Sequence, residues 1–148
     1  MTKGHNYTLI ELVAVIVIAG MLSTIVIICL LATMATPLYL KHMKRARINT
    51  AKTQIRLLEQ AIFDFQLDLK RLPDGEHGLR ELEENVANDE KWDGPYLKQN
   101  VPKDPWGEEY VYVQPGEHGD FDLMSYGNDR QPGGEDEAAD ICNWGTNN

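Results

Sequence analysis

A long apolar run near the N-terminus dominates the pattern of polar and apolar positions. Residues 12–40 contain no charged side chain, and Glu11 is the charged residue immediately before them. As an α-helix rising about 1.5 Å per residue, this run would extend roughly 43 Å, which exceeds the ~30 Å hydrocarbon core of a bilayer. A secretory signal peptide would have a shorter apolar region of about 7–15 residues. The run therefore predicts a membrane-spanning helix.

Beyond Pro37 the apolar residues recur with the period of a helix. Successive members of this group are three, four or seven residues apart, which places them on one face. They are Ile48, Ile55, Leu58, Ile62, Phe65 and Leu69. Heptad-like spacing also suits a coiled coil, but we expect this face to pack within its own domain over residues 55–69. Pro73 would end the helix, and the more polar residues 38–54 would join it to the membrane segment.

The remaining segments predict a short helix and a β-hairpin. The helix is expected at Glu76–Asn88, where apolar residues again share one face. Residues 109–113 (EYVYV) and 121–126 (FDLMSY) alternate as strands do, and a loop containing Pro and Gly joins them. The predicted fold class is therefore α+β: a long N-terminal helix, membrane-spanning in its first half, packed on a small antiparallel β-sheet.

Residues 127–140 form a segment rich in glycine and acidic residues. It contains five acids and few apolar side chains, so it is predicted to be a loop. Oxygen-rich loops with glycines suit Ca²⁺, which takes about 6–8 oxygen ligands, including backbone carbonyls. The D-x-[DN]-x-[DN]-G spacing of an EF-hand is absent. Composition alone fits either a calcium site or, more commonly, a solvated acidic loop.

Charge and cysteine content argue against nucleic-acid binding, zinc binding and redox chemistry. The net charge is −9, with +4 on residues 1–50 and −13 on the remainder. An acidic soluble part repels phosphate, so no nucleic-acid partner is expected. Cys29 lies in the apolar run and Cys142 near the C-terminus, so we expect them not to pair. The chain has no C-x-x-C motif and its four histidines share no ligand spacing, so neither a zinc site nor a redox pair is predicted.

Four short motifs together suggest a family. Residues 7–11 read YTLIE, 71–79 read RLPDGEHGL, 104–107 read DPWG and 140–144 read DICNW. These motifs, with the residues of the predicted hairpin, resemble those of the major pseudopilins of the bacterial type II secretion system, within the wider type IV pilin-like family. The resemblance covers nearly the whole chain. The DPWG turn with the acidic loop is more specific to these pseudopilins than the N-terminal motif.

The resemblance implies processing and assembly. Residues 1–6 would be a leader that a prepilin peptidase removes by cutting between Asn6 and Tyr7, with N-methylation of Tyr7. Residues 7–40 would form the transmembrane and filament-core helix, and 41–148 the soluble pseudopilin domain. Glu11 would pair with the terminal amine of a neighbouring subunit, because an unpaired charge of either sign is costly in the membrane. The alternative is that Glu11 simply reaches the lipid–water interface.

The processing site departs from the family pattern. Asn6 precedes Tyr7, where the family has glycine. The nearest glycine is Gly4, so cleavage between Gly4 and His5 is a second possible frame. That frame would place Glu11 two positions later in the mature chain.

Two further departures concern the membrane helix. Pro37 lies farther from Glu11 than in the family, as though roughly nine residues, or ~13 Å of helix, had been inserted. Basic residues also follow the apolar run: Lys41, Lys44, Arg45 and Arg47. The positive-inside rule would place the C-terminal domain in the cytoplasm, whereas the family places it outside.

For the acidic loop, the resemblance implies structural calcium. The matching positions make Asp129 and Asp140 side-chain ligands and give backbone carbonyls to Tyr126 and Glu137. Some family members have two consecutive acids before the isoleucine, where this chain has Ala139 and Asp140.

The function implied is structural and not enzymatic. Copies of the chain would polymerise from the inner membrane into a short helical filament that drives export of folded proteins. The partners would be other copies, prepilin peptidase, other pseudopilins and inner-membrane secretion components. The chain would be single-pass in the inner membrane, with a periplasmic C-terminal domain. Alternatives are a minor pseudopilin, a type IV pilin subunit or, from a different class, a membrane-tethered hydrolase, for which no nucleophile–base pair is present.

Overall fold

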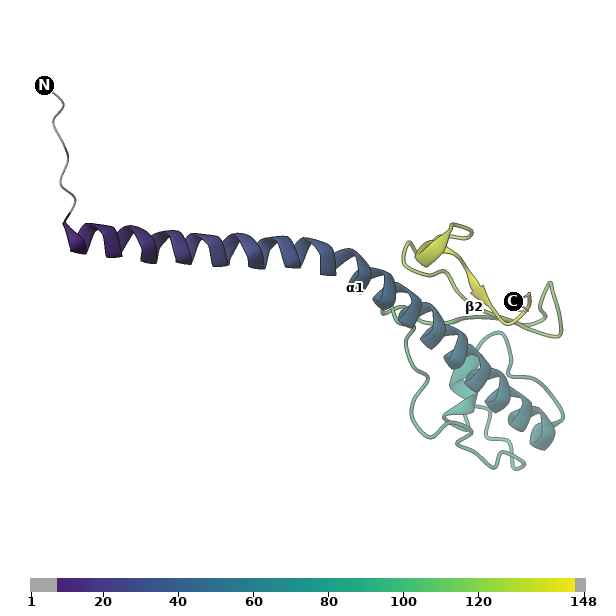
Figure 1. Cartoon of the computed structure of the whole chain (residues 1–148). Helices are drawn as coiled ribbons and strands as arrows, with labels where there is room; N and C mark the ends of the chain where they lie inside the picture. Colours follow the sequence, from purple (N-terminus) through teal and green to yellow (C-terminus); the bar gives the residue numbers. More distant parts are fainter. Residues whose placement is uncertain (1–7, 146–148) are drawn as a thin grey trace, which may run out of the picture. The chain divides into compact units, whose positions relative to one another are not determined.

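One long helix runs through most of the N-terminal half of the chain. The computed structural model describes residues 8–145, and the chain divides into two compact units, Met1–Met43 and Lys44–Asn148. Helix α1 spans Leu9–Leu69 and includes Pro37 (Figure 1). The expectation that the helix continues past the proline is confirmed. Cys29 and Cys142 are both free, as expected.

The first part of α1 is apolar on all sides. The large apolar side chains of residues 9–31 are each 49–80% exposed within the chain, and an 18-residue window has a mean hydropathy of 2.9. Hydroxyl groups in this part donate to carbonyl oxygens of the preceding turn, which satisfies them within the helix. The donors are Ser23, Thr24, Thr33 and Thr36. By length and composition, α1 can cross a membrane.

The second part of α1 buries the predicted stripe. Five of the six stripe residues, from Ile55 to Leu69, are at most 7% exposed, and Ile48 is partly buried against them. Ala51 and Ala61 are also buried on this face. The helix ends at Leu69, and Lys70 adopts a positive φ of 57° while its amide still donates to Gln66. The chain thus leaves the helix before reaching Pro73.

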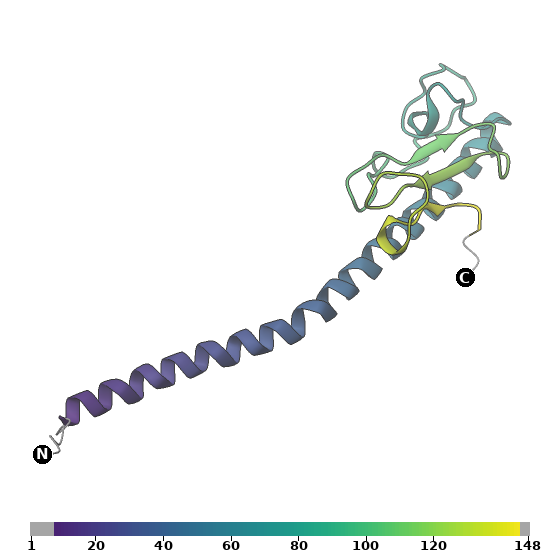
Figure 2. The same ribbon diagram turned by 90° about the horizontal axis from the view of Figure 1, so that it is seen from above.

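A three-stranded antiparallel sheet packs on this stripe (Figure 2). Its strands are β1 (Val111–Val113), β2 (Asp122–Ser125) and β3 (Ile141–Cys142), in the order β1-β2-β3. The predicted hairpin is confirmed as β1 and β2, with shorter strands than expected. β3 was not predicted, because two residues show no alternation. Leu123 of β2 and Ile141 of β3 are buried in the core, together with Tyr110, the residue immediately before β1.

The predicted helix at Glu76–Asn88 is wrong in type and length. In its place lies a five-residue 3₁₀ helix, η1, over Gly78–Leu82; a second, three-residue 3₁₀ helix, η2, lies farther along the chain at Asp136–Ala138. The indole of Trp92 donates to the carbonyl of Glu81, and the amide of Tyr96 donates to the carbonyl of Leu82. Those two carbonyls are therefore unavailable to amides of a following helical turn, and the helix stops.

We expect two nearby phenylalanines of α1 to contribute very differently to the free energy of unfolding. Phe65 is 0% exposed and Phe63 is 53% exposed. Phe65→Ala should lower the free energy of unfolding by about 3–5 kcal/mol, because it removes a ring from a closed core. Phe63→Ala should change it by less than about 0.5 kcal/mol.

Urea unfolding of the full chain in detergent micelles would measure both values. All three tryptophans lie in the unit Lys44–Asn148, so their fluorescence reports on that unit. Equal losses in the two variants would contradict the core assignment.

Candidate functional site

The residues expected to act lie at opposite ends of the chain. Asn6 and Tyr7, the expected processing site, lie outside the described residues. Glu11 lies in the first turn of α1, and the four expected calcium ligands lie around the loop between β2 and β3.

Glu11 closes a capping box at the start of α1. Its carboxylate accepts hydrogen bonds from the amide of Thr8 at 2.8 Å and from the Thr8 hydroxyl at 3.0 Å. The amide of Glu11 in turn donates to the Thr8 hydroxyl at 3.4 Å. This reciprocal arrangement satisfies two helix-terminal donors and follows from the T-x-x-E spacing. A neighbour's amine would therefore have to replace or share these hydrogen bonds.

The β2–β3 ladder closes the acidic loop. Ser125 pairs with Ile141 in the antiparallel register. Extending that register by one residue sets Tyr126 opposite Asp140, so the ladder brings these two expected ligands to the base of the loop. The amide of Asn128 donates to the carbonyl of Glu137 at 2.8 Å, which joins the two sides of the loop above its base.

The two expected aspartate ligands have different surroundings. Asp129 is exposed, and its carboxylate accepts the amide of Gln131 at 3.1 Å. Asp140 accepts the amide of Gly133 at 2.9 Å with one oxygen. Its other oxygen, Oδ1, is buried and has no hydrogen-bond partner among the described residues. A buried carboxylate oxygen without a donor is costly, and a bound cation would remove that cost.

Backbone carbonyls crowd the same end of the loop. Gly127 has a φ of +65°, and a Cβ there would collide with the carbonyl oxygen of Glu137 and lie 3.1 Å from that of Ala139. Two carbonyl oxygens therefore lie close to each other beside the glycine. The Glu137 side chain points elsewhere, since its carboxylate lies 3.5 Å from Lys44 and 3.7 Å from Arg47. Glu137 can therefore offer its carbonyl, but its carboxylate is already paired.

The DPWG turn supports the base of the loop. Asp104 is 5% exposed and accepts the amides of Trp106 and Glu108. It also accepts the hydroxyl of Ser125, whose oxygen accepts the amide of Gly127. A chain of hydrogen bonds thus runs from this turn to the glycine that faces the carbonyls.

The oxygen atoms available as ligands around the loop suit Ca²⁺. Within residues 8–145 neither Asp129 nor Asp140 belongs to a cluster of three metal-binding side chains, so a cation would draw its other oxygens from carbonyls and water. Arg130 does not neutralise the loop, because its guanidinium pairs with Glu108 at 2.9 Å. Burial, followed by the charge of Asp140, raises the pKa of the Cys142 thiol to about 11, so a thiolate ligand is not expected at neutral pH.

This architecture defines a class of protein. An apolar helical span continues without a break into a helix that carries a small antiparallel sheet. A loop closed by the last two strands completes the unit Lys44–Asn148. The arrangement is that of a pilin-like protein.

Comparisons with known proteins identify the family. The family model described as Type II secretion system (T2SS), protein G, matches residues 38–144. Type II secretion system core protein G of Vibrio cholerae serotype O1 is 37% identical, over 97% of this chain and 94% of that protein. The protein of the same name from Escherichia coli K12 is 38% identical, over 97% and 92% respectively. The chain therefore belongs to the protein G family of the type II secretion system.

A solved structure supports the same assignment. The crystal structure of the major pseudopilin from the type 2 secretion system of enterohaemorrhagic Escherichia coli is 33% identical, with a TM-score of 0.57. The match covers 71% of this chain and 92% of that one. The resemblance and the fold class drawn from the sequence are thus confirmed.

Two glycines of the loop provide a test of the crowding around Gly127. Gly133 also has a positive φ, +97°, but a Cβ there would meet nothing within 4 Å. Gly133→Ala should therefore lower the free energy of unfolding by about 1–2 kcal/mol from backbone strain alone. Gly127→Ala should lower it clearly further, because a collision with backbone oxygen is added. Urea unfolding followed by tryptophan fluorescence measures both, and equal losses would show that the loop moves aside freely.

Proposed function

We propose that this chain is the structural subunit of a type II secretion pseudopilus. Copies would polymerise from the inner membrane into a short periplasmic filament that drives export of folded proteins, without catalysing a reaction. The observation that carries the proposal is the family match over residues 38–144, together with relatives aligned over nearly the whole chain. The apolar first part of α1 supplies a span suited both to membrane anchoring and to the core of a filament.

We infer that assembly depends on processing and on Glu11. A prepilin peptidase would cut between Asn6 and Tyr7 and leave a methylated amine a few residues from Glu11. In the free subunit the carboxylate is held by Thr8, which is also the residue next to Tyr7. A neighbour's ammonium offers the carboxylate a charged donor in a low-dielectric environment, where such hydrogen bonds are stronger than neutral ones.

Substitutions at Glu11 can separate helix capping from charge pairing. Glu11→Gln keeps a side chain that can complete the capping box but removes the charge, whereas Glu11→Ala removes both. We expect both variants to insert in the membrane and to abolish filaments and secretion. Glu11→Asp should be intermediate, since the charge remains on a shorter side chain.

Filaments seen by electron microscopy of cells overproducing each variant give the readout. Normal filaments from Glu11→Gln, with loss only in Glu11→Ala, would assign Glu11 to capping instead of pairing. N-terminal sequencing of the wild-type protein from the same membranes should begin at Tyr7. A sequence beginning at His5 would move the processing frame to Gly4.

We further propose that the acidic loop binds Ca²⁺. Asp140 and Asp129 would supply carboxylate oxygens, and Tyr126 and Glu137 backbone carbonyls. Support comes from the buried Oδ1 atom of Asp140 and from the carbonyl of Glu137, which lies beside Gly127. The ion would hold the two sides of the loop together, because residues 127–140 have few apolar side chains to offset their ordering entropy. Ca²⁺ would thereby keep β3 in the sheet.

Calcium should raise the melting temperature of the full chain in detergent relative to chelator. An ion that binds only the folded state stabilises it by about 2.7 kcal/mol at a hundredfold excess over Kd. Asp129→Asn and Asp140→Asn should each erase most of this difference. Asp136→Asn is the matched control and should erase little. Mg²⁺ should have a small effect, because it demands tighter octahedral geometry.

Thermal scans followed by tryptophan fluorescence, with and without chelator, measure these shifts. An unchanged melting temperature and no heat of binding by calorimetry would contradict calcium binding and show that the segment is an ordinary solvated acidic loop.

A further inference from the structure

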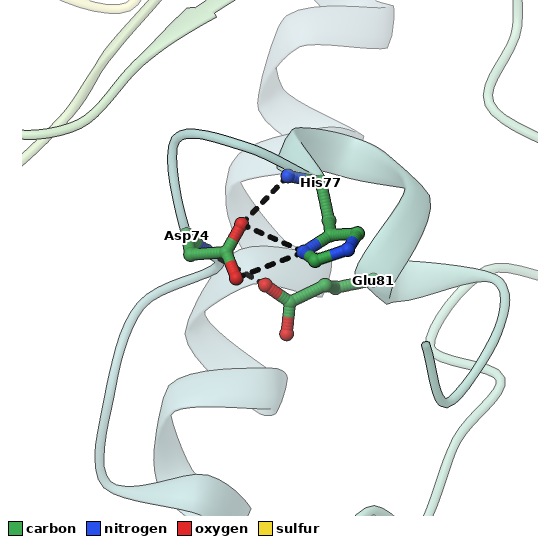
Figure 3. Close-up of side chains that lie close together, drawn as sticks. All are labelled: Asp74, His77 and Glu81. Carbon is green, nitrogen blue, oxygen red and sulfur yellow. Dashed lines mark hydrogen bonds and ion pairs between the residues drawn. The ribbon is translucent and has the colours of Figure 1, made fainter. Parts of the chain in front are cut away.

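Among the described residues, one group of three metal-binding side chains lies outside the acidic loop. Figure 3 shows Asp74, His77 and Glu81 turned toward one another at the junction between the end of α1 and η1. Asp74 lies in the turn after the helix, His77 immediately before η1 and Glu81 within it. One donor atom from each residue lies within 4.8 Å of the other two. This mixed nitrogen and oxygen set is absent from the acidic loop.

The distances fit a small tetrahedral site. Nδ1 of His77 lies 3.0 Å and 3.1 Å from the two carboxylate oxygens of Asp74. In a tetrahedral zinc site with bonds of about 2.0–2.1 Å, neighbouring ligand atoms are about 3.3 Å apart. The imidazole nitrogen and the carboxylate therefore already have nearly the spacing of two adjacent ligands. The side chains of His77 and Asp74 are 36% and 45% exposed, so an ion can reach them from solvent.

Glu81 is held in place by its own partners. Its side chain is 2% exposed, and Oε2 lies 2.6 Å from the guanidinium of Arg71. The other oxygen, Oε1, accepts the amide of Asp74 at 2.7 Å and keeps a second lone pair. Such outer contacts fix the orientation of a metal ligand before the metal arrives. Arg71 offsets one of the two carboxylates, which leaves the cluster with about one net negative charge when His77 is neutral.

We propose that Asp74, His77 and Glu81 form a binding site for a borderline divalent cation such as Zn²⁺. Imidazole nitrogen suits zinc, whereas Ca²⁺ and Mg²⁺ prefer oxygen ligands alone, so this site differs in selectivity from the acidic loop. Water completes the coordination. The ion displaces the hydrogen bond between His77 and Asp74 and joins the turn after α1 to η1. The Tyr112 hydroxyl already ties the same turn to β1 through the carbonyl of Pro73, at 2.9 Å.

The chain contains an internal control. His118 and Asp122 form a similar pair, with Nδ1 of His118 2.9 Å from the carboxylate of Asp122. Within residues 8–145, no third metal-binding side chain joins this pair in a shared cluster. The His118 ring instead stacks on Trp144, with centroids 4.1 Å apart. A pair lacking a third ligand should bind zinc much more weakly.

The test is a zinc titration of the full chain in detergent micelles at mildly alkaline pH. Excess Ca²⁺ is present throughout so that the acidic loop is not free to take zinc. Imidazole NMR signals of the histidines are followed in the wild type and in His77→Gln, Asp74→Asn and His118→Gln. We expect saturable changes at the ring of His77 in the wild type, weakened at least tenfold in Asp74→Asn. Competition with a zinc-binding dye, which does not depend on the ring signal, should show that this zinc binding is lost in His77→Gln. His118→Gln should bind zinc as the wild type does.

Three results would overturn the proposal: no change at His77 at several-fold molar excess of zinc, an equal response at His118, or unchanged binding in His77→Gln. Far-ultraviolet circular dichroism and backbone amide NMR signals like those of the wild type confirm that each variant is folded; tryptophan fluorescence is unsuitable, because the His118 ring stacks on Trp144. Because calcium is held constant and no filament is needed, the result is independent of the proposed calcium loop and of secretion.

Discussion

The packing of the sheet and η1 onto one face of α1 is the interaction on which the unit Lys44–Asn148 depends. The sheet contributes Leu123 and Ile141 to the core, with Tyr110 from the residue just before β1, and η1 contributes Leu79 and Leu82. None of these elements is long enough to bury an apolar face with its own sequence neighbours, since the strands have two to four residues each. These short elements can therefore bury their apolar side chains only by packing against α1. The same helix, α1, also contains the apolar span that is long enough to cross a membrane.

The helix and the hairpin could be predicted because both depend on periodic patterns. The stripe from Ile48 to Leu69 has helical spacing, and the two strands alternate. The end of η1 could not be predicted, because it depends on Trp92 and Tyr96 capturing carbonyl groups from more than ten residues away. β3 could not be predicted either, since its two residues pair with β2 only after the loop has closed.

The candidate sites were predictable to different degrees. The acidic loop was visible in composition, but the assignment of Asp129 and Asp140 as ligands came from the resemblance to the family. The role of Gly127 required the structure, because it depends on carbonyls brought close by the turn. The capping box at Glu11 was readable from T-x-x-E spacing and was missed. The cluster around His77 was also missed, because its D-x-x-H-x-x-x-E spacing belongs to no familiar ligand motif and depends on the short helix.

The pairing of Glu137 with Lys44 and Arg47 affects how tightly the acidic loop could bind calcium. The pairing draws one carboxylate away from the acidic loop, so the proposed calcium site keeps two charged ligands and relies otherwise on carbonyls. Calcium affinity decreases when a site has fewer charged ligands, and extracellular modules bind calcium with Kd values of about 10⁻⁴–10⁻³ M. If the loop binds Ca²⁺ as proposed, a site this weak would stay empty in a calcium-poor compartment and would fill only where calcium is plentiful. The basic residues of α1 would thus make the last step of folding depend on the compartment.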